Sequence, residues 1–105
     1  MSLKSRAEID SLFANGRRLP TPFFTLIWEP SGAFKYGIFV SRHAGSATRR
    51  NRLKRRFREA IRLSRERLTR SGRVGIVPRP TATEPELELL IENVSRLFEQ
   101  LSREN

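Results

Sequence analysis

Hydrophobic residues near the middle of the chain recur at every fourth position, at Leu53, Phe57 and Ile61. This spacing predicts an α-helix with one buried side, and Ser46 or Thr48 is suited to cap its N-terminus. At about 100° per residue, the opposite side of this helix is polar and basic. The expected members of that side, spaced i, i+4, i+7 and i+11, are Asn51, Arg55, Arg58 and Arg62.

The two ends of the chain also have helical hydrophobic patterns. Near the N-terminus, Ser5 and Glu8 have the S-x-x-E spacing of a capping box, and Gly16 is the expected stop signal. A second pair with this spacing, Thr83 and Glu86, predicts the start of a C-terminal helix. Because most charged residues of that helix are acidic, we do not expect it to bind a polyanion.

Aromatic and β-branched residues are concentrated in segments 21–28, 34–41 and 74–77, which we predict to be strands. Segment 17–20 is a candidate edge strand. The Glu-Pro-Ser-Gly turn between the first two long strands predicts that they pair as an antiparallel hairpin. Pro78 predicts that the last strand ends there or lies at a sheet edge. The resulting order, α, β, β, β, α, β, α, is that of an α+β domain whose sheet is covered by helices.

The chain has 105 residues, 37% of them hydrophobic, so we predict a single domain over residues 1–105. It has no cysteine and only one histidine, His43, so disulfides and thiolate metal sites are excluded and a zinc site is not expected. No apolar run has the length of a membrane span, and the N-terminus lacks the hydrophobic segment of a signal peptide. We therefore expect a soluble cytoplasmic protein with no membrane partner.

The positive charge is confined to one part of the chain. The formal net charge is +10, and residues 42–73 hold thirteen Arg or Lys and two Glu, so this segment alone carries +11. Cations occupy eight of the fourteen positions in 49–62, and the whole chain has eighteen Arg against three Lys. Arginine forms bidentate bonds to phosphate and stacks on bases, so this pattern favours a nucleic-acid partner. An anionic membrane surface is the rival partner, but the polar side of the helix lacks Trp or Phe.

The sequence offers no recognisable set of catalytic residues. It has no combination of nucleophile, base and orienting group, and acids such as Glu29 and Glu59 are isolated rather than clustered for a nuclease metal. We therefore predict a protein that binds nucleic acid, with no small-molecule substrate and no cofactor of its own. DNA binding is less favoured because neither a helix-turn-helix nor a zinc motif is present.

Residues 40–62, VSRHAGSATRRNRLKRRFREAIR, resemble the signature of the bacterial ribonuclease P protein component. The family hallmark, Arg-Asn-Arg followed by Lys-Arg and a further Arg three residues on, spans residues 50–58 here. The resemblance extends over the whole chain, through LKSRAEIDSLFANGRR, KYGIFVSR and VGIVPRP. The chain departs from the family pattern at Ile9, where Phe is common, and at His43, where Lys is frequent.

This resemblance implies an αβββαβα fold with a mixed sheet. It places the basic helix in a left-handed crossover between parallel strands, although about 98% of such connections are right-handed. The resemblance also implies an accessory protein subunit of an endoribonuclease whose catalytic groups lie on a large RNA that requires Mg²⁺. The partners implied are this catalytic RNA and precursor tRNA, from which the complex removes the 5′ leader. The alternative is an RNA-binding protein of another ribonucleoprotein, ribosomal or chaperone-like.

Two sets of RNA-contacting residues follow from the resemblance and the charge pattern. Aromatic residues near a sheet surface stack on unpaired bases, although the phenylalanines of the second set are also suited to the core, and that alternative stays open. The residues expected to bind the catalytic RNA are Arg42, His43, Arg50, Asn51, Arg52, Lys54, Arg55, Arg58 and Arg62. The residues expected to line a cleft for the leader, between the first helix and the sheet, are Ile9, Phe13, Arg17, Arg18 and Phe24.

Overall fold

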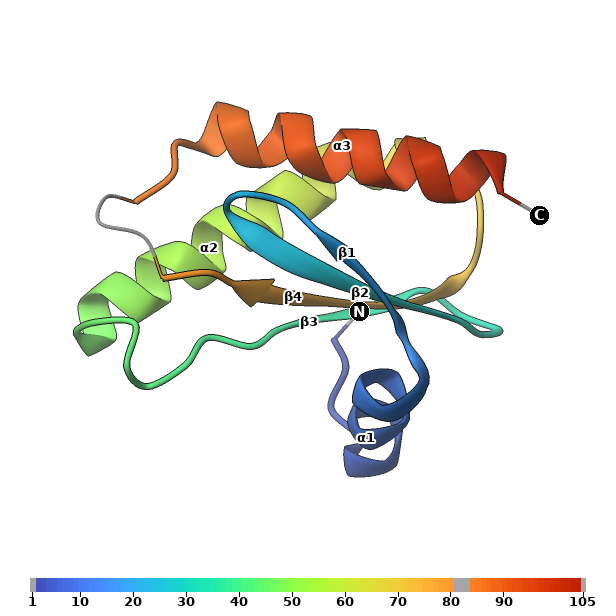
Figure 1. Cartoon of the computed structure of the whole chain (residues 1–105), viewed down its shortest axis with the longest axis horizontal. Helices are drawn as coiled ribbons and strands as arrows, with labels where there is room; N and C mark the ends of the chain where they lie inside the picture. Colours follow the sequence, from blue (N-terminus) through green and yellow to red (C-terminus); the bar gives the residue numbers. More distant parts are fainter. Residues whose placement is uncertain (1, 81–83, 105) are drawn as a thin grey trace. The chain divides into compact units, whose positions relative to one another are not determined.

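The structure is a computed structural model that describes residues 2–80 and 84–104. Its α-helices and strands follow the predicted order (Figure 1). A short 3-10 helix, η1, follows the second α-helix. The elements are α1 (Arg6–Asn15), β1 (Arg17–Pro20), β2 (Phe24–Pro30), β3 (Lys35–Ile38), α2 (Ala47–Ser64), η1 (Arg65–Arg67), β4 (Gly72–Pro78) and α3 (Leu87–Arg103).

The chain is divided into two compact units, and each is described by itself. One contains α1 and the whole sheet, and the other contains α2, η1 and α3. The single domain expected from the length of the chain stays a prediction. The units comprise residues 1–39 with 71–79, and residues 40–70 with 80–105.

The four-stranded sheet has the strand order β1-β2-β4-β3. Both β1 and β4 pair with β2 in antiparallel orientation, whereas β3 pairs with β4 in parallel orientation. The sheet is therefore mixed, and the predicted α+β class is confirmed. Because the chain passes through α2 between the parallel neighbours β3 and β4, this connection is a crossover, and its left hand stays a prediction.

The hairpin predicted between the two long strands is wrong. The strand β2 forms its hairpin with β1 instead, through a turn in which Thr21 Oγ1 donates to the Phe24 carbonyl at 2.9 Å. The same hydroxyl accepts from the amides of Phe23 and Phe24, at 3.1 and 3.0 Å. With β4 on its other edge, β2 has no edge left for β3. Pro78 is the last residue of the central strand β4, where a proline leaves the inner ladder bonds intact, so it marks a strand end and not a sheet edge.

Two of the predicted helix caps are confirmed. Ser5 caps α1 by accepting from the Glu8 amide at 3.4 Å, and Ser46 caps α2 by accepting from the Arg49 amide at 3.1 Å. The Glu8 side chain does not complete a capping box, because it binds cations on the sheet.

In the second unit, α2 packs against α3. The helix α3 begins at Leu87, and its N-cap Glu86 makes no side-chain hydrogen bond to it, while the predicted cap Thr83 lies outside the described residues. The hydroxyls of Ser64 and Ser95 lie 2.8 Å apart and link the two helices. Their buried hydrophobic side chains are Leu53, Phe57, Ala60, Ile61, Leu90, Val94, Leu97, Phe98 and Leu101.

Candidate nucleic-acid interface

The face of the sheet on which α1 packs has a polar end and an apolar part. Alternate residues of a strand share a face, and the register of β2, β4 and β3 aligns them in rows. The rows on this face are Glu29–Arg73–Lys35 at the polar end, and Ile27–Gly75–Gly37 next to it.

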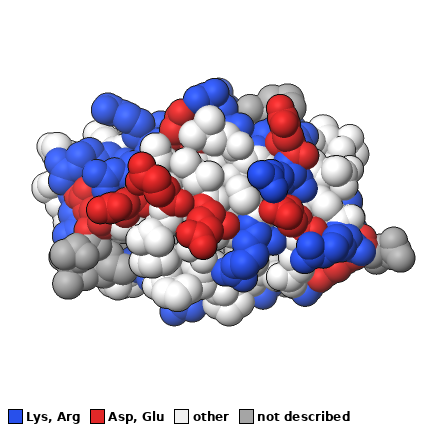
Figure 2. Space-filling view, turned by 90° about the horizontal axis from the view of Figure 1, so that it is seen from above, with Lys and Arg blue, Asp and Glu red and all other residues white. Residues whose placement is uncertain are grey.

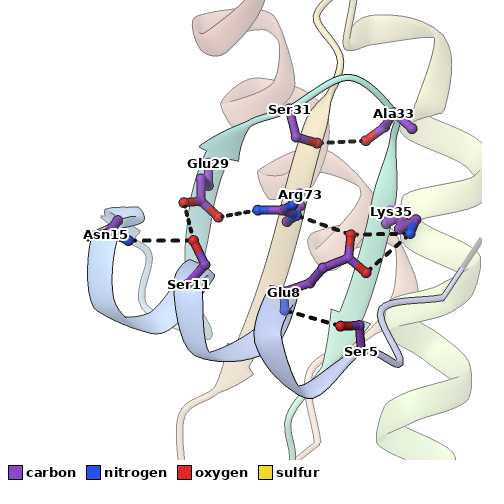
Figure 3. Close-up of polar contacts among 9 residues, drawn as sticks. All are labelled: Ser5, Glu8, Ser11, Asn15, Glu29, Ser31, Ala33, Lys35 and Arg73. Atoms are coloured by element: carbon purple, nitrogen blue, oxygen red, sulfur yellow. Dashed lines mark hydrogen bonds and ion pairs between the residues drawn. The ribbon is translucent and has the colours of Figure 1, made fainter.

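Arg73 lies at the centre of the polar row and connects α1 to the sheet (Figure 3). Its Nη1 donates to Glu29 Oε1 at 2.9 Å, and its Nε lies 3.4 Å from Glu8 Oε2 on α1. Lys35 Nζ donates to both oxygens of Glu8, at 3.1 and 3.2 Å. Ser11 Oγ donates to Glu29 Oε2 at 2.7 Å, and this bond, with Arg73 alongside, holds the pKa of Glu29 below its ordinary value. The network therefore fixes the position of α1 on the sheet.

Phe13 of α1 and Phe39, which follows β3, form an aromatic patch on the same face. Their rings meet edge to face with centroids 5.0 Å apart. A Cβ at Gly37 would lie 2.8 Å from the Phe39 ring and one at Gly75 would lie 3.3 Å from it, so glycine at these paired positions makes room for the ring. Both rings are partly buried. Sequence reasoning missed Phe39, although its alternation with Gly37 along the chain places it on this face.

The residues predicted for the leader differ in how accessible they are. Ile9 and Phe13 are partly buried on α1. Arg17 and Arg18 are exposed on the edge strand β1, where Arg18 Nη2 donates to the Phe13 carbonyl at 3.2 Å. Phe24 is fully buried, so its ring offers no surface for stacking, and we assign it to the core.

The polar side of α2 is exposed as predicted, and we call Asn51, Arg55, Arg58 and Arg62 the basic stripe. Within the described part of the chain, the side chains of its first three members make no hydrogen bond or ion pair. Arg62 is paired with Glu59, and the hydrogen bond between them holds the pKa of Glu59 below its ordinary value. The stripe therefore presents cations that the described protein does not neutralise, apart from Arg62.

A second basic side of α2 is occupied by Glu84, from the segment before α3. Arg52 donates two hydrogen bonds to it, Nε to Oε2 at 3.2 Å and Nη2 to Oε1 at 2.6 Å. Arg56 Nη1 lies 3.1 Å from Oε2, and Arg49 Nε lies 3.8 Å from Oε1. The bonds from Arg52, with the charges of all three arginines, hold the pKa of Glu84 below its ordinary value. We call Arg49, Arg52 and Arg56 the three-arginine site.

The other predicted contacts to the catalytic RNA lie in the loop before α2 and on its first turns. Arg42 and His43 are exposed, and Lys54 is partly buried. Arg50 Nη1 donates to the carbonyls of Arg42 and Gly45, at 3.2 and 3.0 Å, and so holds this loop against α2. A guanidinium has five N–H donors, so Arg50 keeps others for a phosphate.

The surface around α3 mixes charges of both signs, as Figure 2 shows on the face seen from above. A shallow depression of about 400 Å³ in the unit that contains α3 is lined by three arginines, two glutamates and a serine. Its Arg67 pairs with Glu99 at 3.0 Å.

Among the described residues, no group of three His, Cys, Asp or Glu is placed to hold a metal ion. Over the same residues, no helix has the length and hydrophobicity to cross a membrane.

Comparison with known proteins gives one consistent family. The family model described as Ribonuclease P matches residues 1–102. The ribonuclease P protein component of Symbiobacterium thermophilum is 32% identical over 101 residues, which cover 93% of this chain and 88% of the relative. That of Desulfatibacillum aliphaticivorans is 28% identical over 102 residues, with 95% and 86% covered.

The solved structures agree with the sequence relatives. The structure of the RNase P protein from Thermotoga maritima has a TM-score of 0.83 and 25% identity to this chain, covering 95% of it and 96% of the other. Together with the family match over nearly the whole sequence, this likeness covers both the α+β fold and the basic helix. The chain belongs to the bacterial ribonuclease P protein component family.

Proposed function

We propose that this chain, as the protein subunit of ribonuclease P, binds both the catalytic RNA and the 5′ leader of precursor tRNA. Membership of this family indicates that the chain takes part in tRNA processing and that its partner is an RNA. The observation that carries the finer proposal is the basic stripe, where Asn51, Arg55 and Arg58 are exposed and make no side-chain bond to other described residues.

The energetics of α2 favour a polyanionic partner along the stripe. Like charges three or four residues apart destabilise a helix, and the first turn of α2 contains no acid to favour its dipole. The stripe therefore contributes little to folding. A phosphate backbone laid along it relieves the repulsion and releases counterions, which makes binding favourable and strongly dependent on salt.

The aromatic patch is the proposed contact for the leader. Phe13 and Phe39 are only partly buried, so each residue keeps some exposed surface, and an unpaired base stacked on an aromatic ring contributes about 1–3 kcal/mol. The exposed Arg17 and Arg18 of β1 are suited to bind the leader's phosphates. Stacking on aromatic rings tolerates every base, so this surface suits leaders of many sequences.

We assign the catalytic groups and the Mg²⁺ ions to the RNA. Four glutamates of the protein, Glu8, Glu29, Glu59 and Glu84, are paired with arginine or lysine, an arrangement that serves structure. The protein's contribution is then electrostatic, because cations that neutralise phosphates lower the Mg²⁺ concentration needed to hold RNA and substrate together.

Cleavage of precursor tRNA by purified ribonuclease P RNA at low Mg²⁺, with and without this protein, tests the proposal. We expect the protein to restore cleavage at the leader junction, and the double variant Arg55→Ala, Arg58→Ala to do so less well. The matched control is Arg96→Ala, Arg103→Ala on α3, which removes the same charge and should retain the effect. No stimulation by the wild-type protein, or cleavage by the protein without RNA, would contradict the proposal.

A further inference from the structure

We propose that Glu84 is an internal substitute for an RNA phosphate, and that the three-arginine site binds a backbone phosphate once Glu84 is displaced. The inference rests on the proposed function, because it adds a second, self-inhibited contact to the RNA-binding helix. The basic stripe and the three-arginine site are different sides of α2. At about 100° per residue, positions 49, 52 and 56 are centred roughly 120° around the axis from the stripe.

The site holds its carboxylate from several directions. Oxygen Oε1 of Glu84 faces Arg49 and Arg52, while Oε2 faces Arg52 and Arg56. The Glu84 side chain is only 16% exposed, whereas Arg52 is 50% exposed. The arginines can thus be approached from solvent on the side that the carboxylate does not fill.

A phosphodiester suits the site for the same chemical reason as Glu84. Each has one negative charge and two terminal oxygens, and guanidinium binds both groups through the same parallel pair of N–H bonds. A single phosphate therefore gains little by replacing Glu84. An RNA that also covers the stripe delivers several phosphates at once and releases their counterions, so it displaces the carboxylate.

This arrangement lowers the affinity of α2 for nonspecific polyanions. Without RNA, Glu84 offsets one of the three charges at the site and lowers their mutual repulsion. An RNA that reaches only the stripe leaves Glu84 in place and binds more weakly. An RNA whose backbone follows both sides of α2 gains the extra contact. The shape of the RNA therefore decides how many cations of α2 bind its phosphates.

A purely structural role for Glu84 makes the opposite prediction. Arg56 Nη1 also donates to the Pro85 carbonyl at 3.1 Å, so the contacts of Glu84 help to hold the segment before α3 against α2. If that were their only role, neutralising Glu84 would weaken the fold, and RNA affinity would fall or stay constant. Competition with phosphate requires the affinity to rise.

The test compares Glu84→Gln with wild type in binding to ribonuclease P RNA at low salt. We expect about fivefold tighter binding, since the variant keeps the shape of the side chain and loses only the competing charge. The matched control is Glu88→Gln, an exposed acid in the first turn of α3, which should change affinity less than about twofold. The gain should become smaller in an Arg52→Ala background, because Arg52 donates two hydrogen bonds to the carboxylate while Arg49 and Arg56 remain.

Two further measurements separate the possible outcomes. Circular dichroism checks that Glu84→Gln folds. If it does not, Glu84→Asp is used instead, because it keeps the charge but shortens the side chain by one methylene. We expect its RNA affinity to lie between that of wild type and that expected for Glu84→Gln. Affinity that is unchanged or lower in a folded Glu84→Gln, or an equal gain in Glu88→Gln, overturns the proposal. An unrelated RNA duplex is titrated in parallel. Wild-type protein that does not prefer ribonuclease P RNA to this duplex contradicts the proposed function, whereas the effect of Glu84→Gln on the duplex still tests the site.

Discussion

Replacing Arg58 by alanine separates RNA binding from stability. Arg58 is exposed, and its side chain makes no hydrogen bond or ion pair with other described residues. It lies one turn from the like charges of Lys54, Arg55 and Arg62, and each such pair costs a helix about 0.2–0.5 kcal/mol. Salt weakens these repulsions, and Glu59 partly neutralises Arg62. We therefore expect Arg58→Ala to leave the free energy of unfolding unchanged or to raise it by at most about 1 kcal/mol.

RNA binding should respond in the opposite direction to stability. If Arg58 contacts one phosphate, its loss should reduce the slope of log affinity against log salt by about 0.7–0.9. Urea denaturation measures the free energy of unfolding, and titrations of ribonuclease P RNA at several salt concentrations measure the slope. The matched control is Arg52→Ala, which should lower stability because Arg52 is bound by Glu84 in the free protein.

Two results would refute this reasoning. A loss of stability above about 1 kcal/mol in Arg58→Ala would mean that the stripe supports the fold, against its exposure and lack of partners. An unchanged salt slope, with normal stability, would mean that Arg58 meets no phosphate.

Three further predictions concern the core, the aromatic patch and the polar row. Phe57→Ala should lower the free energy of unfolding by about 3–5 kcal/mol in denaturant titrations, because the ring is fully buried. Phe13→Leu should weaken holoenzyme affinity for precursor tRNA with a leader but not for leaderless tRNA, and equal loss for both would return Phe13 to the core. The pKa of Glu29 is lower in the folded protein than in the unfolded chain, so its ionised form stabilises the fold. This contribution is complete above the pKa of the unfolded chain, about 4.3, and is lost as the pH falls through the pKa of the folded protein. Thermal midpoints on acidification should therefore fall more steeply for wild type than for Glu29→Gln, and parallel curves would contradict this assignment.

The sequence predicted those features that depend on neighbouring residues. The caps Ser5 and Ser46 bind amides three residues away, and the buried side of α2 follows from a four-residue period. Strand pairing is decided differently. The turn after β2 was suited to a hairpin, but β1 and β4 already occupy both edges of β2, and no local pattern reports which edges are filled.

The candidate site was predicted only in part for the same reason. Helical spacing sufficed to place the basic stripe, because all its members lie within four turns of one helix. The neutralising contacts were missed, since Arg52 and Glu84 are 32 positions apart, and Arg73 and Glu29 are 44 apart. Phe39 was overlooked because the position of its ring depends on Phe13 of α1 and on glycines in two strands, which are distant in sequence or lie in other elements.

These contacts change what the charge of the basic segment means. The sequence gives residues 42–73 a charge of +11, but its arginines have different surroundings. The Arg58 side chain makes no hydrogen bond or ion pair with other described residues, Arg52 is bound to Glu84, and Arg73 belongs to the network that fixes α1. Only a cation that is unpaired, or whose acid can be displaced, is able to gain a phosphate. The number of cations that bind RNA is therefore given by the slope of log affinity against log salt, and not by the net charge. The change in RNA affinity on neutralising Glu84 then shows whether the arginines paired with it can also bind phosphate.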